Sequence, residues 1–129
     1  MKKPTKEQIE EMAVEIRKFL LEHEIWQDVT IYFNGKAFST SDGTKFYYND
    51  PEHLVVLEDE DPRKCFDYVN PDHILSMSFE GPLYDCLNMN GEYGYAFENM
   101  VSEGLHRIFS KYGCYCELGN AWNLTLYLN

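Results

Sequence analysis

Two segments of the chain repeat apolar residues at the spacing of one helical face. The first repeat consists of Ile9, Met12, Ala13, Ile16, Phe19 and Leu20. The second consists of Phe97, Met100, Val101, Leu105, Ile108, Phe109 and Tyr112. Intervals of three and four residues, with charged side chains between them, are typical of an amphipathic helix. We therefore predict helices over about residues 5–23 and 94–112, each with an apolar face that packs on a sheet or another helix.

Local signals mark where these helices begin and end. Thr5 and Gln8 have the spacing of a capping box, in which each side chain hydrogen bonds to the backbone N–H of the other residue. Lys111 and Gly113 suit the end of the second helix, because a cation favours a helix C-terminus and glycine accepts a positive φ angle.

Short runs of β-branched and aromatic residues, bounded by turn residues, indicate strands. The candidate runs are 29–33, 36–40, 45–48, 54–57, 65–69, 74–79, 114–118 and 122–128. Asn34-Gly35 favours a tight hairpin between the first two runs, and Gly119-Asn120 a turn between the last two. The wholly apolar run 54–57 suits a central strand. Residues 83–88 are ambiguous, because they also fit a helical turn that begins at Pro82.

The order of these elements predicts an α+β domain. Because tight turns join most strands, we expect a mostly antiparallel sheet of about six to seven strands, with the two amphipathic helices packed on one face. Along 74–79 and 122–128, apolar residues alternate with Ser, Thr, Asn and Tyr, so the opposite face is left to polar side chains or to a partner. No repeat or long linker divides the chain, and we treat residues 1–129 as a single domain.

Charge narrows the classes of partner. The formal net charge is −11, and residues 50–103 carry thirteen acidic side chains against two basic ones, Arg63 and Lys64. Such a field repels nucleic acid phosphates and anionic lipid, so we expect no direct nucleic acid binding and no membrane binding. A basic protein partner is electrostatically allowed.

The ends and cysteines of the chain favour a cytoplasmic protein. The basic residues after Met1 are not followed by the apolar region of a signal peptide. The four cysteines are Cys65, Cys86, Cys114 and Cys116, and in such a compartment they are expected to be free thiols.

The patterns for metal sites are poorly matched, and we expect neither a metal nor a cofactor. Cys114 and Cys116 share one face of a strand and are separated by one residue. Zinc sites usually use two cysteines of a turn that are separated by two to four residues, together with a second pair of ligands. The run Glu58, Asp59, Glu60 and Asp61 lacks the spacer residues and the glycine of a calcium loop, and it ends at Pro62.

Catalysis has only weak candidates. A nucleophilic thiol needs a nearby histidine, and the candidate pairs are Cys86 with His106 and Cys65 with His73. No motif for a serine hydrolase, a phosphate-binding loop or a zinc protease is present.

Aromatic residues make up 16% of the chain, and tyrosine and tryptophan favour protein interfaces. We expect Phe46 and Trp122 in the core. Tyr47 and Tyr48 should point to opposite faces of a strand, so one of them must leave the core.

Our first hypothesis is a non-enzymatic protein-binding module that occludes a basic partner, either an immunity protein for a toxin or a mimic of nucleic acid charge. Its contact residues would be Glu58, Asp59, Glu60, Asp61, Tyr47 and Tyr48. A small-ligand domain or small enzyme with a pocket on the open sheet face, with Cys86, His106 and His73 as candidates, is the alternative. A third possibility is self-assembly through an edge strand of the terminal hairpin, and the sequence leaves monomer and dimer open.

Overall fold

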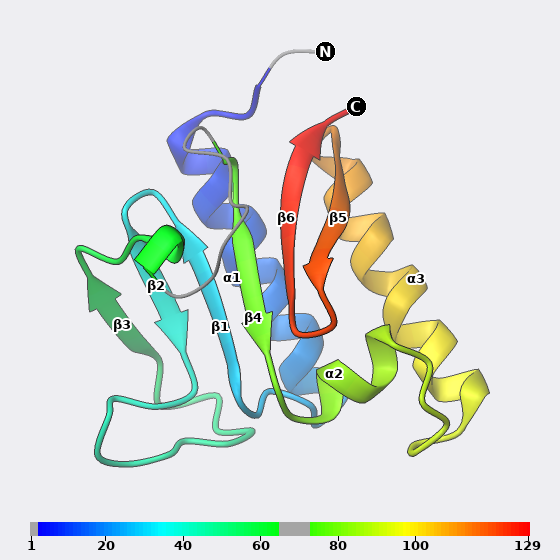
Figure 1. Cartoon of the computed structure of the whole chain (residues 1–129). Coiled ribbons are helices and arrows are strands. Elements are labelled where there is room, and N and C mark those ends of the chain that lie inside the picture. Colours follow the sequence, from blue (N-terminus) through cyan, green and yellow to red (C-terminus); the bar gives the residue numbers. More distant parts are fainter. Residues whose placement is uncertain (1–2, 65–72) are drawn as a thin grey trace.

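The computed structural model describes residues 3–64 and 73–129, which form one sheet with helices packed on it (Figure 1). Its elements, in order, are α1 (Lys6–Glu22), β1 (Val29–Phe33), β2 (Lys36–Ser39), β3 (Val55–Glu58), the 3₁₀ turn η1 (Pro62–Lys64), β4 (Ser76–Phe79), α2 (Pro82–Leu87), α3 (Tyr95–Lys111), β5 (Cys114–Asn120) and β6 (Asn123–Leu128). The ambiguous segment that begins at Pro82 is thus a short helix.

The sheet has six strands in the order β3-β2-β1-β4-β6-β5, and every neighbouring pair is antiparallel. Figure 1 shows α1 and α3 behind this sheet, while η1 lies in front of it. The predicted α+β fold, a largely antiparallel sheet with helices packed on it, is confirmed.

Alternation along the strands separates the two faces as predicted. Ile31 of β1 is paired with Phe38 and with Met77, and all three side chains are buried on the helix side. The neighbouring positions Thr30 and Ser78 face the other way. Because the period of a strand is two residues, this register follows from the position of the apolar residues alone.

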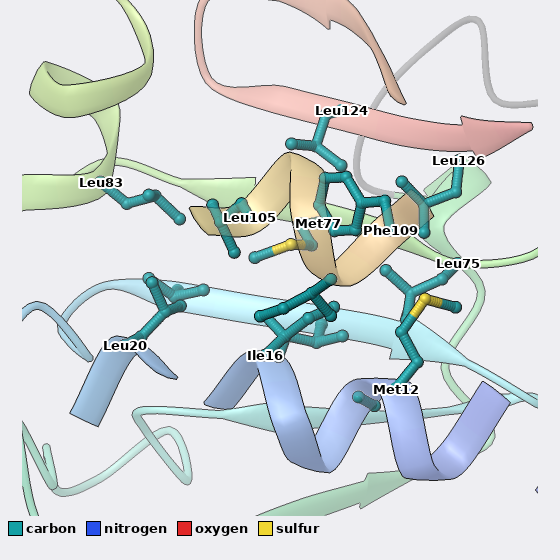
Figure 2. Close-up of a cluster of buried hydrophobic side chains, with 14 of the residues drawn as sticks. Met12, Ile16, Leu20, Leu75, Met77, Leu83, Leu105, Phe109, Leu124 and Leu126 are labelled. Carbon is teal, nitrogen blue, oxygen red and sulfur yellow. The ribbon is translucent and has the colours of Figure 1, made fainter. Parts of the chain in front are cut away.

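A single core fills the space between the helices and the sheet. It joins side chains of α1, α3 and the central strands, labelled in Figure 2: Met12, Ile16, Leu20, Leu75, Met77, Leu83, Leu105, Phe109, Leu124 and Leu126. Full burial of one such side chain is worth roughly 1.5–3 kcal/mol, so this cluster dominates the stability of the fold.

Helix ends and helix contacts follow local rules. Gln8 donates its backbone N–H to the Thr5 hydroxyl, and its own side chain accepts from the Thr5 N–H, which completes the predicted capping box. The ring of Phe19 on α1 lies against Gly104 of α3, where an added Cβ would fall 2.3 Å from the ring. Glycine therefore permits the close approach of the two helices.

Three sequence predictions about strands are wrong. Residues 45–48 form no strand; a single bridge joins Ser41 to Phe46, and Phe46 is 65% exposed rather than in the core. The reason is local: Asp42 accepts hydrogen bonds from the N–H groups of Thr44 and Lys45, which hold the chain in a turn.

The apolar run 54–57 forms β3 at an edge of the sheet, not in its centre, and Val56 is 41% exposed. The turn of the terminal hairpin lies at residues 121–122 rather than at Gly119-Asn120. Trp122 packs beside a small second cluster, Tyr32 and Ala37, on the open face. The strand predicted at 65–69 lies outside the described residues.

Among the described residues, no helix combines the length and apolar character needed to cross a membrane.

Candidate functional site

The segment between β2 and β3, residues 41–54, carries a group of aromatic side chains; we call it the aromatic loop. Phe46 and Tyr48 are 65% and 37% exposed, and their ring centroids are 5.3 Å apart. Tyr47 is half-buried and stacks on His53 at 5.0 Å. Two large aromatic rings of one loop are therefore exposed to solvent. Exposed aromatic side chains that lie together are typical of protein interaction sites.

Polar contacts hold this loop in one conformation. Oδ1 of Asp42 accepts from the N–H groups of Thr44 and Lys45 and from the Thr44 hydroxyl, at 2.7–2.8 Å. These hydrogen bonds lower the pKa of Asp42 to about 2. At the far end, the Asn49 side chain accepts from the N–H of Trp26 at 2.8 Å, and the Asn49 N–H donates to the Trp26 carbonyl at 2.9 Å. Both ends of the loop are thereby tied down.

Carboxylates surround the aromatic rings. The Tyr48 hydroxyl donates to Oδ1 of Asp28 at 2.5 Å, and this hydrogen bond raises the pKa of Tyr48 to about 12. Asp50 lies 2.5 Å from Nδ1 of His53, a contact that lowers the pKa of the Asp50 carboxyl. The loop thus combines exposed rings with negative charge.

A pocket of about 280 Å³ opens beside the loop, where β1, β2, β4 and β6 meet at one end of the sheet; we call it the strand-end pocket. Its lining consists of Asp28, Thr30, Ser39, Thr40, Ser41, Ser78, Phe79, Glu80 and Trp122. The pocket lies on the open face predicted from alternation. Sequence analysis did not identify it, because Asp28 and Glu80 flank strands whose pairing the sequence does not specify.

The acidic run lies elsewhere. Glu58 and Asp59 are exposed, and Glu60 and Asp61 are half-buried. The guanidinium of Arg63 donates two groups to the carboxylate of Asp61: Nε lies 3.0 Å from both carboxylate oxygens, and Nη2 lies 2.7 Å from Oδ2. These hydrogen bonds lower the pKa of Asp61 to about 2. The run follows the end of β3 that is opposite the aromatic loop (Figure 1). The structure therefore separates Tyr47 and Tyr48 from the four acidic candidates.

Of the two predicted thiol–histidine pairs, the structure describes both members of only one, Cys86 and His106, and no hydrogen bond joins them. His106 lies 3.4 Å from Sγ of Cys116, whereas Cys86 is fully buried and desolvation raises its pKa to about 11. Burial also raises the pKa of Cys116. A raised pKa disfavours the thiolate, which is the nucleophilic form of cysteine.

His73 contacts a serine, Ser76. Its Nδ1 lies 3.1 Å from the hydroxyl of Ser76, which also bonds to Thr125 at 3.0 Å. Ser76 is fully buried, so no substrate reaches it in this conformation. Cys65 lies outside the described residues.

No group of three or more His, Cys, Asp or Glu side chains is placed to hold a metal ion in the part of the chain that the structure describes. Comparison with known proteins adds no family: no family model, curated protein or solved structure shows significant similarity to this chain. Function must therefore be argued from the aromatic loop and the strand-end pocket.

Proposed function

We propose that this protein is a non-enzymatic binding module that occludes a basic protein, as an immunity protein or a mimic of nucleic acid charge does, and that the aromatic loop is its contact surface. The observation that carries the proposal is the exposed pair Phe46 and Tyr48, on a loop that also carries Asp42 and Asp50 and whose Tyr48 hydroxyl bonds to Asp28.

Such a surface suits arginine and lysine side chains. Aromatic faces attract cations through their quadrupole, by about 0.5–2 kcal/mol depending on desolvation. Neighbouring carboxylates add charge-assisted hydrogen bonds. Aromatic residues are also the most frequent energetic anchors of protein interfaces.

The loop is ordered before it meets a partner. The hydrogen bonds of Asp42 and Asn49 restrain both of its ends, and Tyr47 is stacked on His53. A surface that is already ordered loses less conformational entropy on binding, which increases affinity without further contacts.

The remaining acidic residues have a different part in this proposal. Glu58, Asp59 and Glu60 make no ion pair with any described residue, and they lie away from the loop. We assign them to long-range attraction, which raises the association rate and weakens with salt. The partner would meet the protein in the cytoplasm, where Cys86, Cys114 and Cys116 would remain the free thiols found here.

The test is capture from lysate of the source organism with tagged wild-type protein, Phe46→Ser and Tyr115→Ser, eluted by stepped NaCl. Tyr115 is a suitable control, because it is also an exposed aromatic residue, at 41%, but lies on β5 at the other edge of the sheet. We expect wild type and Tyr115→Ser to retain the same basic protein and Phe46→Ser to lose it. Equal retention by Phe46→Ser would refute the role of the loop, and an absence of any basic protein would refute the function.

A further inference from the structure

We propose that the strand-end pocket is a binding site for a guanidinium group. The inference rests on the proposed function for one source of that group, an arginine side chain of the basic partner. A free guanidinium compound is the other source, and both share the same recognition chemistry.

The pocket attracts cations. Asp28 and Glu80 line it, and none of the described lining residues is a lysine, arginine or histidine. The two residues flank the paired positions Val29 and Phe79, and the N–H of Glu80 donates to the carbonyl of Asp28 at 3.1 Å. Neither carboxylate forms an ion pair with any residue that the structure describes. Like charges on neighbouring strands repel each other, and a bound cation would relieve that repulsion.

The floor of the pocket supplies hydrogen-bond acceptors. Ser39 and Ser78 are the paired neighbours of Thr30, so three hydroxyl-bearing residues lie in a row across β2, β1 and β4. Thr40 is only 2% exposed and accepts from the N–H of Val29, which fixes its hydroxyl. Hydroxyl oxygens keep a second lone pair for a further donor.

These features fit guanidinium better than ammonium. Guanidinium is planar, has five N–H donors and stacks on aromatic rings, whereas ammonium is a compact point charge. Trp122 is among the residues that line the same pocket, and tryptophan is the strongest aromatic partner for a cation. At 280 Å³ the pocket is smaller than the roughly 300–1,000 Å³ of sites for drug-sized ligands, which suits a single side chain.

The aromatic loop and the pocket adjoin each other, because Ser41 belongs to the loop and also lines the pocket. Asp28 lines the pocket and accepts from the hydroxyl of Tyr48 on the loop, so the two surfaces are continuous. One basic segment could place an arginine in the pocket while its neighbours contact Phe46 and Tyr48.

The first experiment is an ¹⁵N–¹H NMR titration of the full chain with N-acetyl-arginine methylamide and with the lysine counterpart, at about 0.15 M salt to screen nonspecific attraction. We expect saturable shifts at Thr30, Ser39, Ser78 and the Trp122 indole N–H. The arginine compound should bind at least about five-fold more tightly than the lysine compound, because only guanidinium fills a planar set of acceptors. Equal binding of both compounds, or shifts spread over all acidic residues, would overturn the proposal.

Variants sharpen the result. Glu80→Gln and Ser78→Ala should each weaken binding, and Glu80→Gln by roughly ten-fold, because it removes one carboxylate of the charged pair. Glu117→Gln is the matched control, since it makes the same charge change at an exposed position on β5. Melting curves verify that each variant is folded. Full binding by both pocket variants would refute the site.

The source and the proposed function are separated by two further comparisons. Agmatine or free arginine that binds far more tightly than the blocked amide would identify a small molecule as the source; tighter binding of the blocked amide would identify a protein side chain. Phe46→Ser should lose the captured partner but keep the blocked arginine. If the amide binds and no partner is captured, the guanidinium site is supported and the proposed function is refuted. If a partner is captured and the amide does not bind, the proposed function is supported and the guanidinium site is refuted.

Discussion

The carboxylate of Asp28 is shared by two surfaces, since it accepts from Tyr48 of the aromatic loop and also lines the strand-end pocket. Its backbone has a φ angle of 55°, in the left-handed region that aspartate accepts more readily than most residues. Immediately before β1, this angle helps to set the direction of the side chain. Asp28 thus links the loop to the pocket, which Ser41 of the loop also lines.

The Tyr48 hydroxyl provides a direct measure of that contact. Its pKa is raised to about 12, because the hydrogen bond to Asp28 and the charge of the carboxylate favour the protonated phenol. We expect Asp28→Asn to lower the pKa toward the ordinary value near 10. Carbon-13 NMR of ring-labelled tyrosine, with Tyr48→Phe to assign the resonance, would measure it. An unchanged pKa in Asp28→Asn would contradict the contact.

The same shift has a consequence for stability. A group whose pKa is higher in the folded than in the unfolded protein stabilises the fold below its unfolded pKa. The contribution of Tyr48 is therefore fully present below about pH 10 and is lost as the pH rises through about 12.

Individual residues show where sequence reasoning stops. Phe46 lies in a run with strand-like composition, so the core was the natural prediction, but the hydrogen bonds of Asp42 turn the chain and leave Phe46 in solvent. Asp28 and Glu80 are far apart in sequence, and only the pairing of β1 with β4 brings them together. No local pattern indicates such a pairing.

At the scale of elements, periodicity predicted both long helices and the alternation of faces along the strands. It did not predict the strand order, and the apolar run 54–57 appeared central although β3 lies at an edge. A short apolar run indicates that a strand is buried, but it does not indicate how many strands lie beside it. The number of neighbouring strands depends on the topology of the whole sheet. The apolar spacing of the two helices likewise does not predict that Phe19 contacts Gly104.

That contact leads to a prediction about helix packing. In Gly104→Ala the new Cβ would lie 2.3 Å from Phe19, so the ring must move. Overpacking costs about 1–3 kcal/mol, and the better helix propensity of alanine returns up to about 1 kcal/mol. We expect a net loss of about 1 kcal/mol in the free energy of unfolding, measured by urea denaturation.

A double-mutant cycle identifies the cause of that loss. In a Phe19→Ala background the ring is absent, so Gly104→Ala should become neutral or stabilising. A Gly104→Ala variant that is more stable than wild type in the original background would show that the helices do not depend on this glycine.

For the whole molecule, the dominant feature is uncompensated negative charge. The net charge is −11, and the described residues contain only three ion pairs of lysine or arginine and one contact of His53 with Asp50, all with partly or largely exposed side chains. Exposed pairs contribute about 0–1 kcal/mol each, so they do not offset repulsion across the molecule. The acidic run after β3 and the carboxylates around the aromatic loop extend this field over both ends of the edge strand.

We therefore predict that NaCl stabilises the free protein, with Tm rising by a few °C between about 0.02 and 0.2 M, because salt screens the repulsion between like charges. Chloride is the appropriate anion, since sulfate would also strengthen apolar burial. The double variant Glu58→Gln, Glu60→Gln should have a higher Tm than the wild-type protein at low salt, and its Tm should rise less when NaCl is added. A Tm that falls as NaCl is added would show that the ion pairs outweigh the repulsion. Since salt should stabilise the fold while it weakens attraction to a basic partner, release of the partner at moderate salt cannot be attributed to unfolding.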